Sequence, residues 1–406
     1  MIFRNRPLAR FGAAALLASG VFTGLGAPAY ASGTETDLAI DVVGTRVASG
    51  TEGKLAFAKV TNKGKNTPSE LAIRMDVSKV DFDKVFALPL TDGECEIEGE
   101  GEQPTLWTCG VDKEVLPGPG ETIEVPIGLL KVADLKGAYR APIKVTLISA
   151  DDTDKSNNSK SAQVEFTTES GPDLTVLAPD VKNAVTVKNG QIEIGGDLHA
   201  GDTAMLVFMA INQGDAPAAG LKVEVKLPKG VTFTDTEKDC EYNPANTLAS
   251  CTYDNLPLVP IQEDDGEDDK VYSGGSFYHL LSVDADVKAG ALTGGVVTVD
   301  PILPTRALSR SALQVRSLPA NVTGIDGGDI DASDNSDGYA VVVAAKGGSG
   351  GGGKDDDQGG LPVTGPQAGM IGGIGAAVLL AGGAMFLVAR RRRVVLVAPA
   401  DEKTNN

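Results

Sequence analysis

The stretch LKVEVKL, residues 221–227, alternates strictly between aliphatic and charged side chains. LAIRMDV, residues 71–77, also places an aliphatic or methionine side chain at every second position. Successive side chains of a β-strand point to opposite faces, so a period of two predicts strands with one buried and one solvated face. No stretch of either region shows a sustained helical period with caps, and we therefore expect an all-β fold.

Both stretches belong to an internal repeat. LAFAKVTNKG, residues 55–64, recurs as MLVFMAINQG, residues 205–214, and other segments recur in the same order. Turn signals such as Asn-Lys-Gly separate the short strands, which is a pattern typical of β-sandwiches. We predict two tandem β-sandwich domains, at 35–168 and 172–345, joined at 169–171.

One long segment of the second repeat, HAGDTAMLVFMAINQGDAPAAGLKVEVKLPKGVTF, residues 199–233, resembles the Ig-like conserved repeats and CARDB-type domains of bacterial surface proteins. The shared features are a turn before an apolar strand, an Asn-x-Gly end to that strand, and a following strand that ends in Leu-Pro-x-Gly-Val. His199-Ala200 stands where the family usually has a proline, and the first domain lacks the Leu-Pro-x-Gly-Val turn. The resemblance implies Ig-like β-sandwiches with a binding or structural role.

Each predicted domain contains one close pair of cysteines, Cys95 with Cys109 and Cys240 with Cys251. Four cysteines allow three connectivities, and the recurrence of the spacing in both domains favours the two local pairs. An exported chain lies in an oxidising compartment, where such disulfides persist. Free thiols or a metal site are the alternatives, although the spacing matches no zinc pattern.

The C-terminal region combines three features in a fixed order. The motif LPVTG, residues 361–365, precedes an uncharged stretch at 369–389, which is followed by Arg390, Arg391, Arg392 and Arg393. About 20 apolar residues span a bilayer core, and positive charge stays on the cytoplasmic side. We therefore predict a single C-terminal transmembrane helix at 369–389 with a basic cytoplasmic tail at 390–406. The Gly/Asp-rich stretch at 346–360 is predicted to be a flexible linker.

This order resembles the LPxTG sorting signal of Gram-positive surface proteins, which Leu361, Pro362, Val363, Thr364 and Gly365 match residue for residue. The resemblance implies that a sortase cleaves the chain after Thr364 and links the threonine carbonyl to peptidoglycan. Only the precursor would then be inserted in the membrane, and the mature protein would lie in the cell wall, on the extracellular face. The tail after the arginines is longer than is usual in the family.

Residues 1–31 resemble a secretory signal peptide. Three arginines precede a short apolar stretch, and Ala29 and Ala31 form the small-x-small pattern that signal peptidase accepts. We place the cleavage after Ala31. A permanent N-terminal anchor is the alternative, but the apolar stretch is short for that role.

The composition offers little for catalysis. The chain has 406 residues, a formal net charge of −19 and two histidines. Nucleic acids select basic faces, so we expect no nucleic-acid partner. His199 falls in a predicted turn and His279 in a predicted strand, and neither accompanies a nucleophile motif. We expect no catalytic residue, no metal and no cofactor.

Two acidic runs, at residues 94–102 and 263–269, could hold calcium, because clustered carboxylates are the ligands that this ion prefers. Such runs more often form solvated loops, and we expect no tight calcium binding from the second run, because nothing rigid in the sequence would hold its carboxylates together.

Lys59 interrupts the otherwise apolar stretch LAFAKVT. Two interpretations are open for this residue. It could form an isopeptide crosslink with Asn157 or Asn158, or its stem could pack while its ammonium group reaches water.

These observations favour a secreted protein that is anchored to the cell wall and acts as a non-catalytic structural or adhesion-like binding module. Its partners would be a sortase, peptidoglycan, and a protein or glycan ligand that the sequence does not name. A wall-associated enzyme or enzyme accessory domain is one alternative, and a pilin-like subunit is another. The first would need a catalytic constellation and the second a pilin lysine motif, and neither is visible in the sequence.

Overall fold

The computed structural model describes residues 36–345 except 43–44, 101–102, 133–134, 189–190, 235, 264–270, 304–321 and 326–334, and it describes only the backbone of 322–325. Within these residues the regular structure consists of β-strands and three short 3-10 helices, so the described part is all-β as predicted. The described residues belong to one compact unit. No helix among them is long and apolar enough to cross a membrane.

Several sequence predictions fall on residues that the structure does not describe. They are the signal peptide with its cleavage site, the linker, the LPVTG motif, the transmembrane helix and the arginine-rich tail. These remain predictions.

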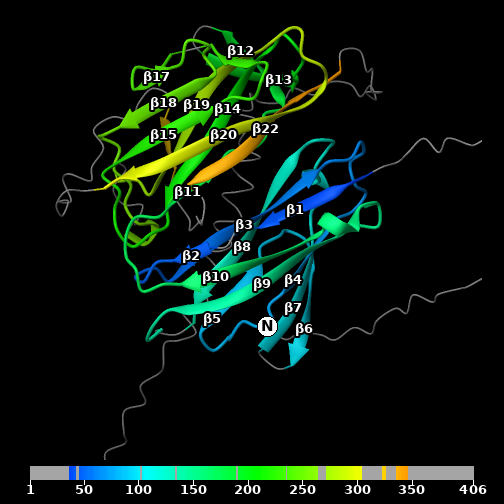
Figure 1. The fold of residues 1–406 in the computed structure, drawn as a ribbon, viewed down its shortest axis with the longest axis vertical. Coiled ribbons are helices and arrows are strands. Elements are labelled where there is room, and N and C mark those ends of the chain that lie inside the picture. Colours follow the sequence, from blue (N-terminus) through cyan, green and yellow to red (C-terminus); the bar gives the residue numbers. More distant parts are fainter. Residues whose placement is uncertain are drawn as a thin grey trace, which may run out of the picture. The chain divides into compact units, whose positions relative to one another are not determined.

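Two sheets form the first half of the fold, which we call the N-terminal sheet pair (Figure 1). The first sheet has four strands in the order β1 (Leu38–Val42), β3 (Gly53–Asn62), β8 (Thr122–Lys131), β5 (Val85–Pro89). The second has six in the order β2 (Thr45–Val47), β10 (Ser159–Phe166), β9 (Tyr139–Ile148), β4 (Ala72–Asp76), β7 (Gln103–Gly110), β6 (Cys95–Glu100). Buried side chains from both sheets form one hydrophobic core, an arrangement consistent with a β-sandwich. The short helices η1 (Lys113–Val115) and η2 (Lys155–Asn157) lie in its loops.

Two further sheets form the C-terminal sheet pair. The larger has the order β13 (Gln191–Asp197), β12 (Asn183–Lys188), β14 (Thr203–Asn212), β19 (Gly274–Val283), β16 (Val231–Phe233), with β11 (Leu174–Leu177) beside β14 and β21 (Val322–Ile325) beside β19. The smaller has the order β17 (Cys240–Tyr242), β18 (Leu248–Tyr253), β15 (Gly220–Lys226), β20 (Gly290–Ile302), β22 (Ser336–Val343). They also enclose a single core, and η3 (Ile261–Glu263) precedes β19.

The two sheet pairs repeat one strand order. The path β1-β3-β8-β5 corresponds to β11-β14-β19-β16, and the path β10-β9-β4-β7-β6 corresponds to β22-β20-β15-β18-β17. The two alternating stretches of the sequence are the equivalent strands β4 and β15. Their aliphatic and methionine side chains enter the cores, whereas Arg74 and Lys222 are exposed. The repeat seen in the sequence is therefore a structural repeat, and the precise domain boundaries stay a prediction.

In each repeat, a buried asparagine at the end of strand β3 or β14 forms hydrogen bonds with the backbone of the neighbouring loops. The Nδ2 group of Asn62 donates to the carbonyls of Asn66 and Pro117, and its Oδ1 accepts from the Gly64 N–H. The equivalent Asn212 donates to the carbonyls of Ala216 and Leu258 and accepts from the Gly214 N–H. Both side chains are fully buried, which explains the Asn-x-Gly pattern at each strand end.

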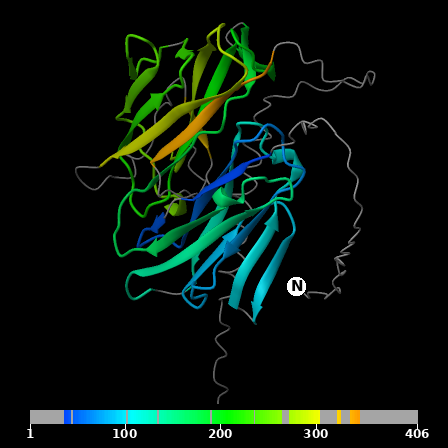
Figure 2. The ribbon, with the colours of Figure 1, turned by 45° about the vertical axis from the view of Figure 1, so that its right-hand side comes forward.

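Both cysteine pairs are disulfides between neighbouring strands, with the local pairing that the sequence favours. Cys95 is bonded to Cys109, across the hairpin of β6 and β7, and Cys240 to Cys251, across β17 and β18. In each case the two cysteines are directly opposite in the strand register. Figure 2 shows the first hairpin, in cyan, at the edge of its sheet. The disulfides therefore secure the outermost strand of each repeat.

We predict that Asn212→Ala lowers the free energy of unfolding by about 2–4 kcal/mol, because two carbonyls and two N–H groups would lose their partner. Urea denaturation of the variant measures the effect. Asn183→Ala is the matched control, since Asn183 is exposed on β12. Equal effects of the two substitutions would contradict the role given to Asn212.

Candidate functional site at the junction of the two sheet pairs

The central strand β3 is buried on both of its faces. Ala56, Ala58 and Val60 point into the core of the N-terminal sheet pair. On the opposite face, Leu55 forms a separate cluster with Leu177, Met209 and Ile211 of β11 and β14, and Phe57 packs against it. The two sheet pairs therefore contact each other through this apolar cluster. We use the name junction for the cluster together with the polar contacts around it. Burial on both faces explains why this stretch reads as a nearly continuous apolar run.

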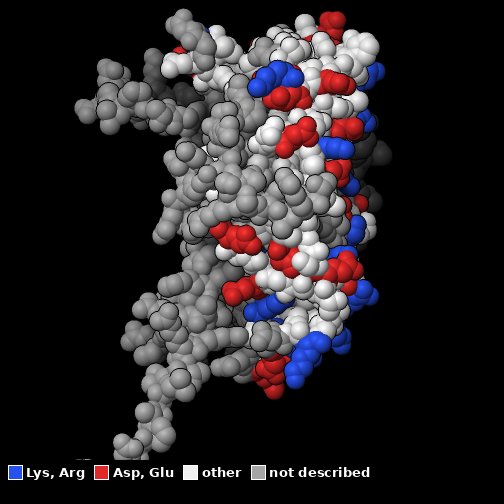
Figure 3. Space-filling view, turned by 90° about the vertical axis from the view of Figure 1, so that its left-hand side faces the viewer, with Lys and Arg blue, Asp and Glu red and all other residues white. Residues whose placement is uncertain are grey.

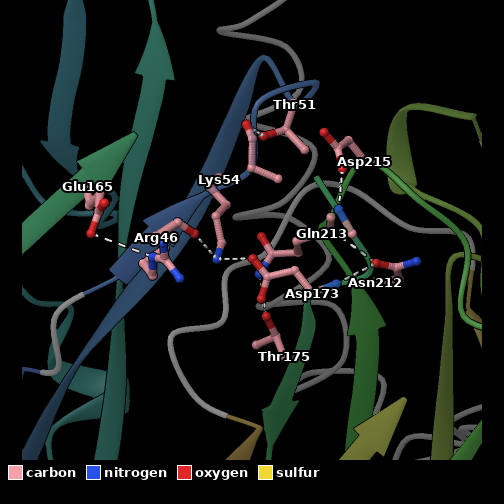
Figure 4. A network of polar contacts seen from close by, with 12 residues as sticks. Arg46, Thr51, Lys54, Glu165, Asp173, Thr175, Asn212, Gln213 and Asp215 are labelled. Carbon is pink, nitrogen blue, oxygen red and sulfur yellow. Dashed lines mark hydrogen bonds and ion pairs between the residues drawn. The ribbon is translucent and has the colours of Figure 1, made fainter. Parts of the chain in front are cut away.

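Lys54 begins the polar part of the junction (Figure 4). Its side chain has no exposed surface, and its Nζ lies 2.6 Å from the carbonyl of Arg46 and 2.6 Å from Oδ2 of Asp173. Burial raises the pKa of Asp173, and the nearby Lys54 ammonium opposes that rise. A buried charge is tolerated only when it is paired and hydrogen-bonded, so Lys54 and Asp173 require each other.

Gln213 connects this ion pair to the apolar cluster. Its backbone N–H donates to the Asp173 carbonyl at 2.7 Å. Its side-chain Oε1 accepts from the Leu55 N–H at 3.3 Å, and its Nε2 donates to the Thr175 hydroxyl. The side chain is completely buried. Gln213, which belongs to the C-terminal sheet pair, therefore accepts a hydrogen bond from a backbone N–H of β3.

Asp215 holds the predicted joint between the domains. Its Oδ2 accepts from the Ser49 hydroxyl at 3.2 Å and the Gly50 N–H at 2.6 Å. Its Oδ1 accepts from the Ser170 hydroxyl at 2.8 Å and the Gly171 N–H at 2.7 Å. Partial burial would raise the pKa of Asp215, but these hydrogen bonds outweigh it and the pKa is lowered. The joint is consequently tied to both sheet pairs by one ionised carboxylate.

Asp180 makes a similar link further along the junction. Its Oδ2 accepts from the Thr122 N–H of β8 at 2.6 Å, and its Oδ1 accepts from the Ala340 N–H of β22 at 2.7 Å. Burial raises the pKa of Asp180 to about 6, although the two N–H groups act in the opposite direction. One side chain thus bridges backbone groups of both sheet pairs.

A third group of charges surrounds Lys59. Its ammonium group contacts Oδ1 of Asp337 on β22, and Glu124 of β8 lies directly opposite Lys59 in the strand register. The second oxygen of Asp337 accepts from the Ala178 N–H at 2.7 Å. The Asp337 side chain is only 1% exposed, and burial raises its pKa against the effect of Lys59. Burial and the charge of Asp337 raise the pKa of Glu124 to about 8.

This arrangement corrects both interpretations that the sequence left open for Lys59. Its ammonium group is paired with Asp337 rather than placed in water. Asn157, one of the two crosslinking partners considered, donates to Asp37 instead. The partner of Lys59 is a carboxylate of the other sheet pair, far away in the sequence.

The two histidines have structural positions. His279 is buried on β19 between the rings of Phe208 and Phe233, and burial lowers its pKa to about 4, so it is neutral at physiological pH. His199 lies in a turn, where its ring nitrogen contacts the Asp197 carbonyl. No group of three or more potential metal-ligating side chains occurs in the described part of the chain.

The two acidic runs differ in what the structure shows. The first lies mainly on β6, whose residues are all exposed, and its last two residues, 101–102, are outside the described residues. Most of the second, residues 264–269, is outside the described residues. On the face shown in Figure 3, acidic and basic side chains are interspersed among the described residues. The described residues of that face therefore form no large field of a single sign.

No family model and no curated protein matches this chain. Among solved structures, it is similar to the C-terminal domain of the AgI/II polypeptide BspA from Streptococcus agalactiae, at 11% identity and a TM-score of 0.20, over 76% of this chain and 100% of that one. It is also similar to the B domain of a biofilm associated protein, at 9% identity and a TM-score of 0.23, over 66% and 81% of the two chains. A cohesin from Archaeoglobus fulgidus matches 32% of this chain and 92% of its own, at 12% identity and a TM-score of 0.20. Likenesses this distant carry no argument about function.

We predict that Asp180→Asn changes how stability depends on pH. The folded pKa of about 6 is above the unfolded value, so the folded state binds the proton more tightly, and wild-type stability falls as pH rises. Relative to the non-titrating variant, the wild type should lose free energy of unfolding between about pH 4 and about pH 6. Urea denaturation across this range measures the difference.

The control is Asp300→Asn, which removes the same charge from an exposed position on β20. A difference between wild type and Asp180→Asn that stays constant or grows with pH would contradict the assignment.

Proposed function

We propose that this chain is a secreted surface protein that a sortase links to peptidoglycan through Thr364, with two Ig-like domains that serve as a non-catalytic structural or binding module. The observation that carries the proposal is the order of the C-terminal sequence. The LPVTG motif, the uncharged stretch at 369–389 and the four arginines follow one another directly. The partners in this proposal are the sortase, peptidoglycan and a protein or glycan ligand.

The disulfides support an exported location. Each one joins two neighbouring strands of a β-hairpin, and such bonds persist where thiols are not kept reduced. The matching strand orders of the two sheet pairs also support a repeat architecture, in which one structural unit is used twice.

The junction supports a module that acts as one piece. Lys54, Asp180 and Asp215 each bond across the two sheet pairs, and an apolar cluster lies between them. An interface with buried charges and apolar packing resists the bending that a bare linker allows. Such a module would hold a binding surface at a fixed distance from its attachment point.

The sorting signal is tested by Thr364→Ala, which removes the residue whose carbonyl the sortase would transfer. We expect the variant to move from the cell-wall fraction to the membrane or the medium, measured by immunoblotting of fractions released by wall digestion. Val363→Ala is the matched control, because the middle position of the motif is variable in the family that it resembles. A Thr364→Ala variant that is released only by wall digestion would overturn the proposal.

A further inference from the structure

We propose that β6 is the docking site for an extended basic segment of a partner protein, which joins the six-stranded sheet as an additional strand. This inference rests on the proposed function of the chain as a binding module. It assigns the ligand to one class, a protein with an extended segment rich in lysine or arginine. It does not depend on attachment to the cell wall.

One side of the β6 backbone is left unpaired. β6 is the last strand of its sheet and pairs with β7 alone, and Figures 1 and 2 show no described strand along its outer side. The Gly110 N–H donates to the Glu94 carbonyl at 3.1 Å. Hydrogen-bonded and non-hydrogen-bonded positions alternate along an antiparallel pair. The backbone N–H and C=O groups of Cys95 and Ile97 therefore point away from β7, where a further strand can pair with them.

The disulfide holds this strand in position for a partner. It joins Cys95, the first residue of β6, to Cys109 of β7. All six residues of β6 are exposed, so the strand contributes little to the core. A strand that a covalent bond already fixes loses little conformational entropy when a ligand binds to it. Residues 95–98 pair regularly with β7 before the register shifts between Glu98 and Gly99, and they form the regular part of the edge.

The two faces of β6 differ in chemistry. Ile97 lies directly opposite Trp107, so the two side chains are neighbours on the face that continues the core. Ile97 is nevertheless 56% exposed. Trp107 is buried, but its indole N–H has no hydrogen-bond partner among the described residues. Buried donors are normally paired, and this one lacks an acceptor beside an uncovered apolar side chain. Glu96 and Glu98 project from the opposite face of the strand.

The glutamates determine which kind of strand can bind. Glu94, Glu96, Glu98 and Glu100 are all exposed, and no ion pair of theirs occurs within the described part of the chain. In an antiparallel pair of two β6 strands centred on Ile97, Glu96 of each copy would face Glu98 of the other. Like charges directly opposite each other destabilise a sheet, whereas opposite charges stabilise it. Pairing with a second copy is therefore disfavoured, and a strand with lysine or arginine at alternate positions is favoured.

The second repeat provides an internal comparison. Its equivalent strand, β17, has only three residues, and both of its end residues are half-buried. Glu241 is its single exposed residue. β17 offers neither the length nor the row of carboxylates that β6 has, so the proposed docking site belongs to the N-terminal sheet pair alone.

The proposal is tested by titrating the full-length chain with a capped synthetic heptapeptide of alternating lysine and valine. Trp107 is the only tryptophan of the chain and lies opposite Ile97, so its fluorescence reports binding at β6. We expect a saturable change in emission. A peptide of alternating glutamate and valine should give none. The lysine peptide with every backbone N–H methylated should also give none, because it keeps its charges but cannot donate to a strand edge.

Two sets of variants test the contacts. Glu96→Lys combined with Glu98→Lys should weaken binding of the lysine peptide about tenfold or more and allow the glutamate peptide to bind. Glu241→Lys, which reverses a charge on β17, is the matched control. Ile97→Thr should weaken binding about fivefold through the lost apolar contact, and Val115→Thr changes another exposed aliphatic side chain as its control. An intact Cys95–Cys109 disulfide and an unchanged near-UV circular dichroism spectrum show that each variant is folded.

Three results would overturn the proposal. The first is the absence of a saturable change with the lysine peptide at millimolar concentration. The second is equal binding of the methylated peptide, since the attraction would then be electrostatic without strand pairing. The third is a dimer of the wild type, measured by sedimentation equilibrium, that Ile97→Thr dissociates, because a second copy would then occupy β6. Thr364→Ala should bind the peptide as the wild type does, which separates this result from the test of wall anchoring.

Discussion

Charges that are removed from water at the junction need partners from the opposite sheet pair, and the arrangement of the two halves depends on this constraint. Lys54 has no exposed side-chain surface, and Asp337 has almost none. If the sheet pairs separated, each of these charged groups would lose its partner, and water would have to solvate it instead. Breaking one partner of a buried ion pair typically costs about 3–5 kcal/mol, so the constraint is strong at each position.

The short joint between the two halves, residues 169–171, is also held in place by hydrogen bonds. Connections between domains are commonly flexible and solvated. Here Asp215 accepts hydrogen bonds from Ser170 and Gly171 of the joint and from Gly50 of the N-terminal sheet pair. The Glu169 carbonyl also accepts from the Ser49 N–H. The joint is therefore part of the folded structure, and the two repeats form one module rather than two independent domains on a flexible linker.

Sequence patterns over a few residues predicted those features of the structure that depend only on neighbouring residues in the chain. The alternation at 71–77 and 221–227 predicted β4 and β15, and the recurring Asn-x-Gly predicted equivalent strand ends. The contacts of Lys59 were not predictable in this way, because its partner Asp337 lies 278 residues away and follows a segment with no clear pattern. Lys54 likewise resembles an ordinary polar residue at the start of a strand. The one usable signal was the loss of alternation after Leu55, which indicates burial on both faces of β3.

The position of Asp337 near the start of β22 has a mechanical consequence. β22 is the last described strand, and the chain continues from it toward the C-terminal region. Tension applied from that end would enter the fold at the C-terminal end of β22 and pass along the strand to Asp337. The ion pair of Asp337 with Lys59 would then pass part of the load to β3. Both sheet pairs would therefore bear the load together, because the strand that receives it is paired with a strand of the other half.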